Sequence, residues 1–367
     1  MFDFVTIVSR FWRCRFWRIS HRYLILDIDL IELHSLIHAT VTWFAKKRKS
    51  NFKMTNFTSH LNQETIKLST CSLNMEDSKG TKYIFNPYFF VSVNVILSIT
   101  SLSGNILILA ALPKVLSLHP PSKLLFQCLS CTDLFVGLLS QPLFITYLAT
   151  ISNKNWSICG VTESLTHISS AILCGESINT LTAISVDRLL ALLQVVNYKR
   201  VRLFVIISWS ASFSFALTYL WNKRFFFLLC SIWIATCLAI STSCYARIYV
   251  TLYRQRVQVQ NAIQRGPTGG FLMNIARYQK TVSSALWVHL TMIVCYLPYT
   301  IAAAVSTIRG KSSSNIIAWN IAAILVLFNS SLNPALYCWK IREVRHAVKE
   351  AIGQYICSVW AAQSNSL

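Results

Sequence analysis

Acidic residues are scarce in this sequence, with only 13 Asp and Glu among 367 residues. Charged residues of both signs make up 13% of the chain, whereas soluble domains carry about 25%. A chain with so little charge cannot easily build a water-facing surface, and its 54% hydrophobic content excludes disorder. The 12 cysteines are too sparse for a small disulfide scaffold. These absences leave an integral membrane protein with several spans.

Seven stretches are long and apolar enough to cross a bilayer, whose core of about 30 Å needs about 20 helical residues. They are expected at about 87–112, 123–150, 159–193, 203–221, 225–250, 277–308 and 313–339. A short amphipathic stretch at 340–352 follows, with apolar residues at helical spacing and basic residues between them. The sequence therefore predicts an all-α membrane protein, a seven-helix bundle with an amphipathic eighth helix on the cytoplasmic side.

The basic residues predict the orientation of this bundle. One alternate set of loops and ends holds sixteen Lys and Arg, and the opposite loops hold five. By the positive-inside rule the richer set is cytoplasmic, so the N-terminus is outside and the C-terminus inside, in the plasma membrane. Asn56 and Asn155 begin sequons on the outer side, where glycosylation is possible. Because the net charge of +21 lies beside apolar spans, we expect no nucleic-acid partner.

The domain organisation follows from these assignments. Residues 1–53 are basic and aromatic, and acids interrupt their apolar stretch, so they form neither a signal peptide nor a span. Our hypothesis is that Met54 is the working start and that 1–53 is an upstream extension. Residues 54–86 then form an outer tail, 87–339 the bundle, and 340–367 an inner surface helix and tail.

Polar groups inside the expected spans are costly and usually functional. Asp133 lies in the middle of the second span and needs a partner, water or a cation; a protonated, hydrogen-bonded structural role is the alternative. Oxygen-bearing side chains on other spans can reach the same depth, and together they could hold a small hard cation such as sodium. They are Asn105, Ser177, Asn329, Ser330 and Asn333.

Three further motifs mark the ends and bends of the spans. The third span closes with Asp187-Arg188, an adjacent acid and base, although an arginine at a membrane interface can simply reach for lipid headgroups. Pro298 and Pro334 each remove a backbone hydrogen bond from a span and so predict a kink. The kink at Pro334 could swing Tyr337.

The order of these motifs resembles the rhodopsin-like class of G-protein-coupled receptors over about residues 85–352. The matching features are Gly104-Asn105, Leu129 to Asp133, Asp187-Arg188-Leu189, Trp209, Tyr245, Cys295 to Pro298 and Asn333 to Tyr337. The chain departs from the family pattern in the loop between spans four and five, which is short and lacks cysteine, so the usual disulfide to that loop is not expected. Glu163 stands where the family's cysteine would be, and Cys159 lies four residues earlier. The short loop, the missing disulfide partner and the absence of a proline from span five together resemble the branch of melanocortin and neighbouring adenosine and lipid receptors.

The resemblance implies roles for individual residues. Arg188 would be held inactive through Asp187 and would contact a heterotrimeric G protein after release, with Tyr245 and Tyr337 closing on it. Pro298 would be the hinge of the sixth span, within a switch that also includes Asn333 and Pro334. The resemblance also implies an allosteric sodium pocket at Asp133, Ser177, Asn329, Ser330 and Asn333.

The ligand site is expected on one face of the third span, where residues recur at spacings of three and four. This face carries Glu163, His167, Ser170 and Cys174, and Tyr296, Tyr299 and Asn320 could add contacts from spans six and seven. Glu163 and His167 are the preferred polar contacts, and their ionisation would make binding sensitive to pH. Ser170 stands where amine receptors carry Asp, and Leu327 where opsins carry Lys. A peptide, nucleoside or lipid is therefore favoured over an amine or retinal.

The sequence indicates no enzyme, because it contains no pairing of a nucleophile and a base. A transporter or channel is one alternative, although no inverted repeat is found; a decoy receptor that does not signal is another. Membrane lipids are further partners, since Cys357 follows the surface helix and could be palmitoylated. A flexible inner loop is expected at about 254–277, where Gly266-Pro267 favours a turn.

Overall fold

The computed structural model describes residues 87–115, 120–153, 155–193, 198–263, 269–309, 316–340 and 342–364. The chain divides into two compact units, Met1–Gln63 and Glu64–Leu367, and every described residue lies in the second. The expectations for residues 1–53, for the tail 54–86 and for Asn56 lie outside the described residues.

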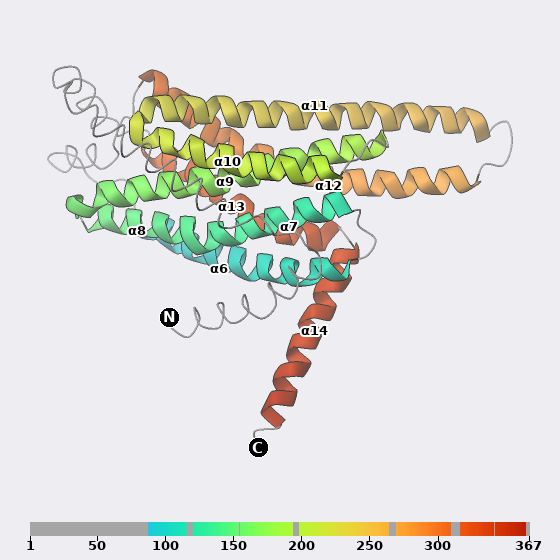
Figure 1. Cartoon of the computed structure of the whole chain (residues 1–367), viewed down its shortest axis with the longest axis horizontal. Coiled ribbons are helices and arrows are strands. Elements are labelled where there is room, and N and C mark those ends of the chain that lie inside the picture. Colours follow the sequence, from blue (N-terminus) through green and yellow to red (C-terminus); the bar gives the residue numbers. More distant parts are fainter. Residues whose placement is uncertain are drawn as a thin grey trace. The chain divides into compact units, whose positions relative to one another are not determined.

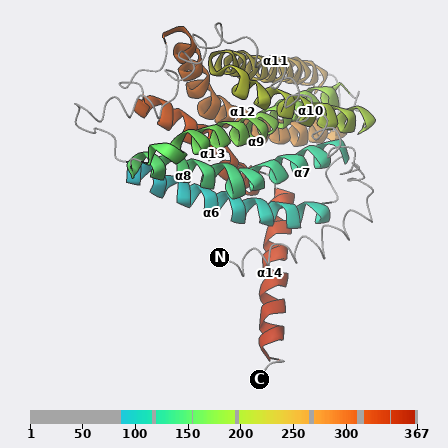
Figure 2. The same ribbon diagram turned by 60° about the vertical axis from the view of Figure 1, so that its left-hand side comes forward.

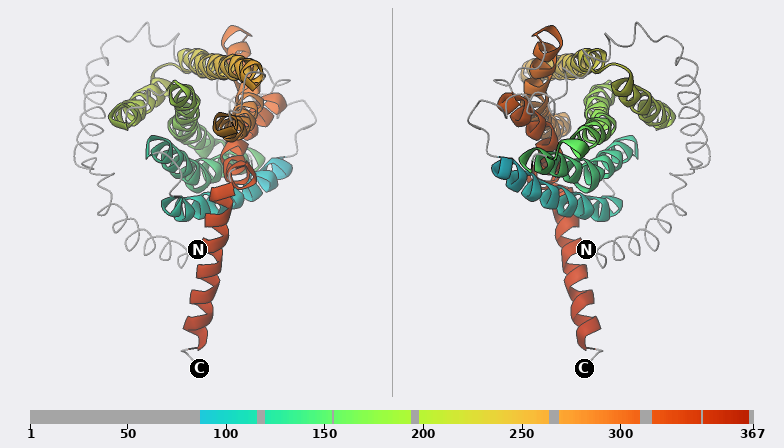
Figure 3. Two further views of the ribbon diagram at one scale, coloured as in Figure 1. Left: turned by 90° about the vertical axis from the view of Figure 1, so that its right-hand side faces the viewer. Right: turned by 90° about the vertical axis from the view of Figure 1, so that its left-hand side faces the viewer.

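The described part of the chain is helical throughout, which confirms the seven-span bundle with an eighth helix. Seen nearly end-on in Figure 3, the span helices lie side by side as one bundle. The second span is built from three successive segments, α7, η4 and α8. In chain order the elements are α6 (Pro87–Ala111), η3 (Leu112–Lys114), α7 (Pro120–Phe135), η4 (Val136–Ser140), α8 (Gln141–Ser152), α9 (Trp156–Leu192), α10 (Tyr198–Trp221), α11 (Lys223–Ile263), α12 (Gly269–Arg309), α13 (Ile316–Lys340) and α14 (Arg342–Ser364).

The third span, α9, is less apolar than the other six spans and is covered by neighbouring helices. Six segments of the described chain are long and apolar enough to cross a membrane, with mean hydropathies of 1.5 to 2.1, and α9 is not among them. It packs against helices of the second span and of the fourth to seventh spans. These helices are α7, α8, α10, α11, α12 and α13. Because neighbouring helices cover it, its polar side chains meet protein instead of lipid.

The first and seventh spans approach closely at a glycine. A Cβ placed on Gly104 of α6 would lie 2.9 Å from the Cβ of Pro334 in α13. Beside this contact the Nδ2 of Asn105 donates to the carbonyl oxygen of Ser330 at 3.1 Å. Backbone contact therefore holds α6 against the proline-containing part of α13.

The prediction of a flexible inner loop at 254–277 is wrong over most of that range. α11 continues to Ile263 and α12 begins at Gly269, so only 264–268 falls outside the described residues. The two extensions run beside one another in Figure 1. Their Arg, Gln and Ala residues favour helix, so the chain continues each helix beyond the span.

The eighth helix is longer than expected, because α14 continues to Ser364 and not to 352. It packs against α6 and α13 and runs across the direction of the span helices, as Figures 1 and 2 show. Lys114, at the end of η3 just after the first span, binds α14. The Lys114 Nζ lies 3.6 Å from the Glu350 carboxylate and donates to the Gln354 side chain at 2.7 Å. This direction suits a helix lying along a membrane surface.

Candidate functional site

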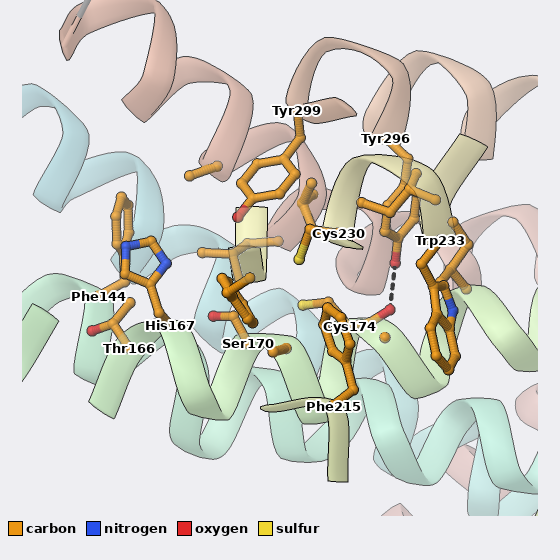
Figure 4. Close-up of a pocket in the computed structure, with 18 of the residues that line it drawn as sticks. Phe144, Thr166, His167, Ser170, Cys174, Phe215, Cys230, Trp233, Tyr296 and Tyr299 are labelled. Atoms are coloured by element: carbon orange, nitrogen blue, oxygen red, sulfur yellow. Dashed lines mark hydrogen bonds between the residues drawn. The ribbon is translucent and has the colours of Figure 1, made fainter. Parts of the chain in front are cut away.

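A cavity opens between the helices near the start of α9, and we call this part of the bundle the Glu163 end. Figure 4 shows side chains from several helices converging on it. Six of the seven residues expected to contact ligand line this cavity: Glu163, His167, Ser170, Cys174, Tyr296 and Tyr299. Asn320 is buried, at 2% exposure, but is not part of the cavity wall. The 3.6-residue period of α9 places its four predicted contact residues on one face, as the sequence predicts.

Most of the rest of the cavity wall was not found from the sequence. It is aromatic and aliphatic, and it comes largely from helices whose rotation the sequence does not reveal. Examples are Phe144 of α8, Phe215 of α10, and Phe226, Cys230 and Trp233 of α11. The aromatic composition of these spans was a weak signal, because the same residues also pack in lipid-facing positions.

Aromatic rings surround His167 at the Glu163 end. Its ring centroid lies 5.1 Å from that of Tyr219, 5.4 Å from that of Phe227 and 6.4 Å from that of Trp319. Tyr299 extends this group, with 5.3 Å between its ring centroid and that of Trp319. Such rings give a cavity a rigid, largely apolar wall suited to a flat or apolar ligand.

Glu163 has a basic partner that the sequence analysis missed. The Nζ of Lys223, the first residue of α11, lies 3.5 Å from the Oε2 of Glu163. The Glu163 side chain is 1% exposed and that of Lys223 is 15% exposed, so this ion pair is buried. One helical turn before Glu163, Cys159 is fully buried and disulfide-bonded. Its bonding partner is not among the eight free cysteines of the described helices.

Tyr296 connects the cavity to the middle of the bundle. Its hydroxyl donates to the carbonyl oxygen of Cys174 at 3.1 Å, which joins α12 to α9 (dashed in Figure 4). One turn further along α9, the Oγ of Ser177 donates to Asp133 Oδ1 at 3.0 Å. The other carboxylate oxygen of Asp133 accepts a hydrogen bond from Asn333 Nδ2 of α13 at 2.7 Å. Asp133 therefore joins the second, third and seventh spans.

Several polar atoms around Asp133 are buried without a hydrogen-bond partner in the described structure. They include Ser130 Oγ, Asn105 Oδ1, Asn333 Oδ1 and both side-chain atoms of Asn329. Ser330 is likewise buried, at 1% exposure. Unpaired buried polar groups cost free energy, so their concentration in one place marks a site for a bound ion, for water or for a second arrangement of the helices.

At the other end of α9, which we call the Arg188 end, the acid and base contact the second span. Asp187 is buried and accepts a hydrogen bond of 2.6 Å from Ser122. The guanidinium carbon of Arg188 lies 5.9 Å from the ring centroid of Phe126. Phe126 also packs edge-on against Tyr337, with centroids 4.9 Å apart. Phe126 therefore contacts both Arg188 and Tyr337, which the family resemblance implies come together on activation.

Tyr245 is held between the fifth and sixth spans. Its ring lies 4.8 Å from that of His289, centroid to centroid, with 32° between the planes. His289 Nε2 is also 3.2 Å from Thr242 Oγ1, one turn before Tyr245. Pro298 lies inside α12 and Pro334 inside α13, at the two expected kinks.

The expected modification sites are placed only in part. Asn155 is exposed just before α9, which leaves glycosylation sterically possible. Cys357 falls within α14, but its side chain lies outside the described part of the structure. Both modifications stay predictions.

Comparison with known proteins agrees with this geometry. The chain matches the family described as 7 transmembrane receptor (rhodopsin family) over residues 104–226 and 218–337. Adenosine receptor A3 of Ovis aries is 25% identical over 287 residues, which cover 70% of this chain and 87% of that receptor. Trace amine-associated receptor 5 of Homo sapiens is 24% identical, covering 70% and 82%, and melanocortin receptor 4 of Danio rerio is 24% identical, covering 72% and 82%.

These matches confirm the resemblance seen in the motifs and decide against a transporter or channel. They also confirm that the protein is not an enzyme. The chain belongs to the rhodopsin family of seven-transmembrane receptors, and it is a G-protein-coupled receptor.

Proposed function

We propose that this receptor works in the plasma membrane, with the Glu163 end outside and the Arg188 end in the cytoplasm. An extracellular ligand enters the cavity, and the helices pass its effect to a heterotrimeric G protein at the Arg188 end. The observation that carries this proposal is the course of α9. The same helix lines the cavity, holds Asp133 through Ser177 and ends in Asp187-Arg188. A small shift of one rigid helix would thus be felt at all three places.

The switch at the Arg188 end uses contacts that have a second arrangement available. Ser122 holds Asp187, and the Phe126 ring packs against both Arg188 and Tyr337. The Tyr337 hydroxyl is buried without a partner in the described structure, so a movement that brings it to a polar group would be favourable. The proline in α12 weakens that helix at Pro298 and provides a hinge for such a movement.

We also propose that the Asp133 cluster holds sodium in the resting receptor. The residues fit: one buried carboxylate and the oxygens of Ser177, Asn329, Ser330 and Asn333 suit a small hard cation. A bound sodium ion would supply the positive charge that the Asp133 carboxylate lacks among the described residues. Wild-type receptor should then melt at a higher temperature in sodium chloride than in choline chloride, and Asp133→Asn should remove that difference. Equal melting of the wild-type receptor in both salts would contradict a sodium site.

The ligand is a peptide, a nucleoside or a lipid. The relatives are named for adenosine, a trace amine and melanocortin, so their names alone leave three chemistries open. A hydroxyl at Ser170, in place of an acid, argues against an amine, and the aromatic wall suits a flat or apolar molecule. Screening these three classes for second-messenger responses would identify it.

The test of the receptor function is nucleotide exchange on a purified heterotrimeric G protein by membranes that contain the chain. Exchange above that of receptor-free membranes, removed by Arg188→Ala, would support the proposal. Exchange that is absent for every G-protein family would favour a decoy receptor instead.

A further inference from the structure

One ion pair, between Glu163 and Lys223, controls the charge of the cavity. Among the described residues of the cavity wall, Glu163 carries the only formal charge with His167 neutral. Lys223 does not line the cavity, but its ammonium group lies 3.5 Å from the Glu163 carboxylate. These two charges cancel, so the described residues that line the cavity, taken together with Lys223, carry no net charge.

The backbone holds Lys223 in this place. α10 ends at Trp221 and α11 begins at Lys223, with Asn222 alone between them. The side-chain oxygen of Asn222 accepts a hydrogen bond from the Phe225 amide at 3.1 Å. The backbone carbonyl oxygen of Asn222 accepts one from the Phe226 amide at 2.9 Å. Asn222 thus caps α11 at its N-terminus, and a capped first turn leaves the Lys223 backbone little freedom.

The Glu163 carboxylate stabilises the Lys223 charge more than it would stabilise a lysine elsewhere in a helix. The N-terminus of a helix carries partial positive charge, so a lysine there is repelled by its own helix. The first turn of α11 contains no acidic residue that could compensate. Glu163 of α9 supplies that negative charge from across the helix interface. The Lys223 Nζ also lies 5.2 Å from the ring centroid of Tyr219, which adds a cation–π contact.

A charged ligand would disturb this pair. A cation that approached Glu163 would have to displace Lys223, and the displaced ammonium would stay beside a positive helix end. An anion would lie against the Glu163 carboxylate unless it took Lys223 away, which would separate that buried carboxylate from its ammonium partner. Both exchanges carry the cost of breaking a buried ion pair. An uncharged ligand leaves the pair intact and uses the aromatic wall.

Building on the proposed receptor function, we infer that the ligand is an uncharged molecule with an aromatic or apolar body, and that the Glu163–Lys223 pair excludes amines from the cavity. Lys223 is then a specificity-determining residue although it is outside the cavity wall. The pair also distinguishes this chain from a receptor with a free acid at the same place, where the carboxylate would attract a cationic ligand.

The test uses two probes that differ in one group, phenethylamine and propylbenzene, in which a methyl replaces the ammonium. The melting temperature of the purified receptor in nanodiscs should rise with propylbenzene and not with phenethylamine. Lys223→Met should create a response to phenethylamine, because it removes the ammonium group that lies beside Glu163. The double variant Glu163→Gln/Lys223→Met should return to the wild-type pattern. Arg224→Met, which removes an exposed neighbouring cation, is the matched control and should behave as wild type.

Two results would overturn the inference: stabilisation of the wild type by phenethylamine, or no stabilisation of it by propylbenzene. If Lys223→Met does not fold, Glu163→Gln carries the test, because it leaves Lys223 unpaired. It should then be stabilised by the anion hydrocinnamate while the wild type is not, and an equal response of both would count against the pair as a filter. These measurements need no G protein, so a failure of nucleotide exchange would leave them interpretable.

Discussion

The two ends of α9 differ in how many of their buried polar groups have partners. At the Glu163 end the carboxylate has Lys223 and the Tyr296 hydroxyl has the Cys174 carbonyl oxygen, and the Tyr219 hydroxyl is the exception in the described structure. From Asp133 toward the Arg188 end, several polar atoms are buried without a partner in the described structure, the hydroxyl of Tyr337 among them. Paired groups favour one arrangement, whereas unpaired groups can gain by moving. The comparison suggests a prearranged recognition site above a region that is ready to rearrange.

The largest effect expected is at the Arg188 end. Arg188→Ala should reduce nucleotide exchange to the level of receptor-free membranes while surface expression stays unchanged, because the guanidinium is the proposed contact with the G protein. Arg200→Ala is the control, since Arg200 is an exposed arginine at the start of the next helix. Equal nucleotide exchange by the two variants would show that Arg188 is not a specific contact with the G protein.

The next effect is at the Glu163 end and concerns stability. Lys223→Met should destabilise the receptor by about 3–5 kcal/mol, because it removes one charge of a buried ion pair. Glu163→Gln/Lys223→Met should recover most of this loss, since neither charge remains. Melting temperatures of the two single variants and the double variant measure the coupling. Additive losses would mean that the pair does not act as a unit.

A smaller effect tests the packing that holds α6 against α13. Gly104→Ala should cost about 1–3 kcal/mol, because the new methyl would overlap Pro334. The same change at Gly160, where nothing lies within 4 Å of the added Cβ, should be neutral or stabilise by up to about 1 kcal/mol. Thermal melting compares the two. A Gly104→Ala receptor as stable as Gly160→Ala would mean that the helices can separate without cost.

The smallest effect compares two buried tyrosines directly. Tyr296→Phe removes the hydrogen bond to the Cys174 carbonyl oxygen and should cost about 1 kcal/mol. Tyr337→Phe removes a hydroxyl that has no partner in the described structure, so it should leave resting stability unchanged or slightly raised. Its effect should appear in ligand-stimulated nucleotide exchange instead. The reverse order of melting temperatures would contradict the contrast between the two ends.

Much of the site was predictable because a helix has a fixed period. Asp133, Ser177 and Asn333 were expected to meet, and hydrogen bonds join them. Glu163, His167, Ser170 and Cys174 were expected on one face, and they line one cavity. Asn320 was expected beside them and is not part of that wall, because its direction depends on how α13 is rotated within the bundle.

The sequence by itself determined the seven spans, the polar cluster in their middle and the acid–base pair that closes the third. These follow from the thickness of a bilayer, the cost of polar groups within it and the period of a helix. Only the tertiary structure decided that Lys223 pairs with Glu163, that Phe126 contacts both Arg188 and Tyr337, and that α11 and α12 continue past the spans. Such contacts join residues far apart in the chain, and the rotation and depth at which two helices pack decide which side chains meet.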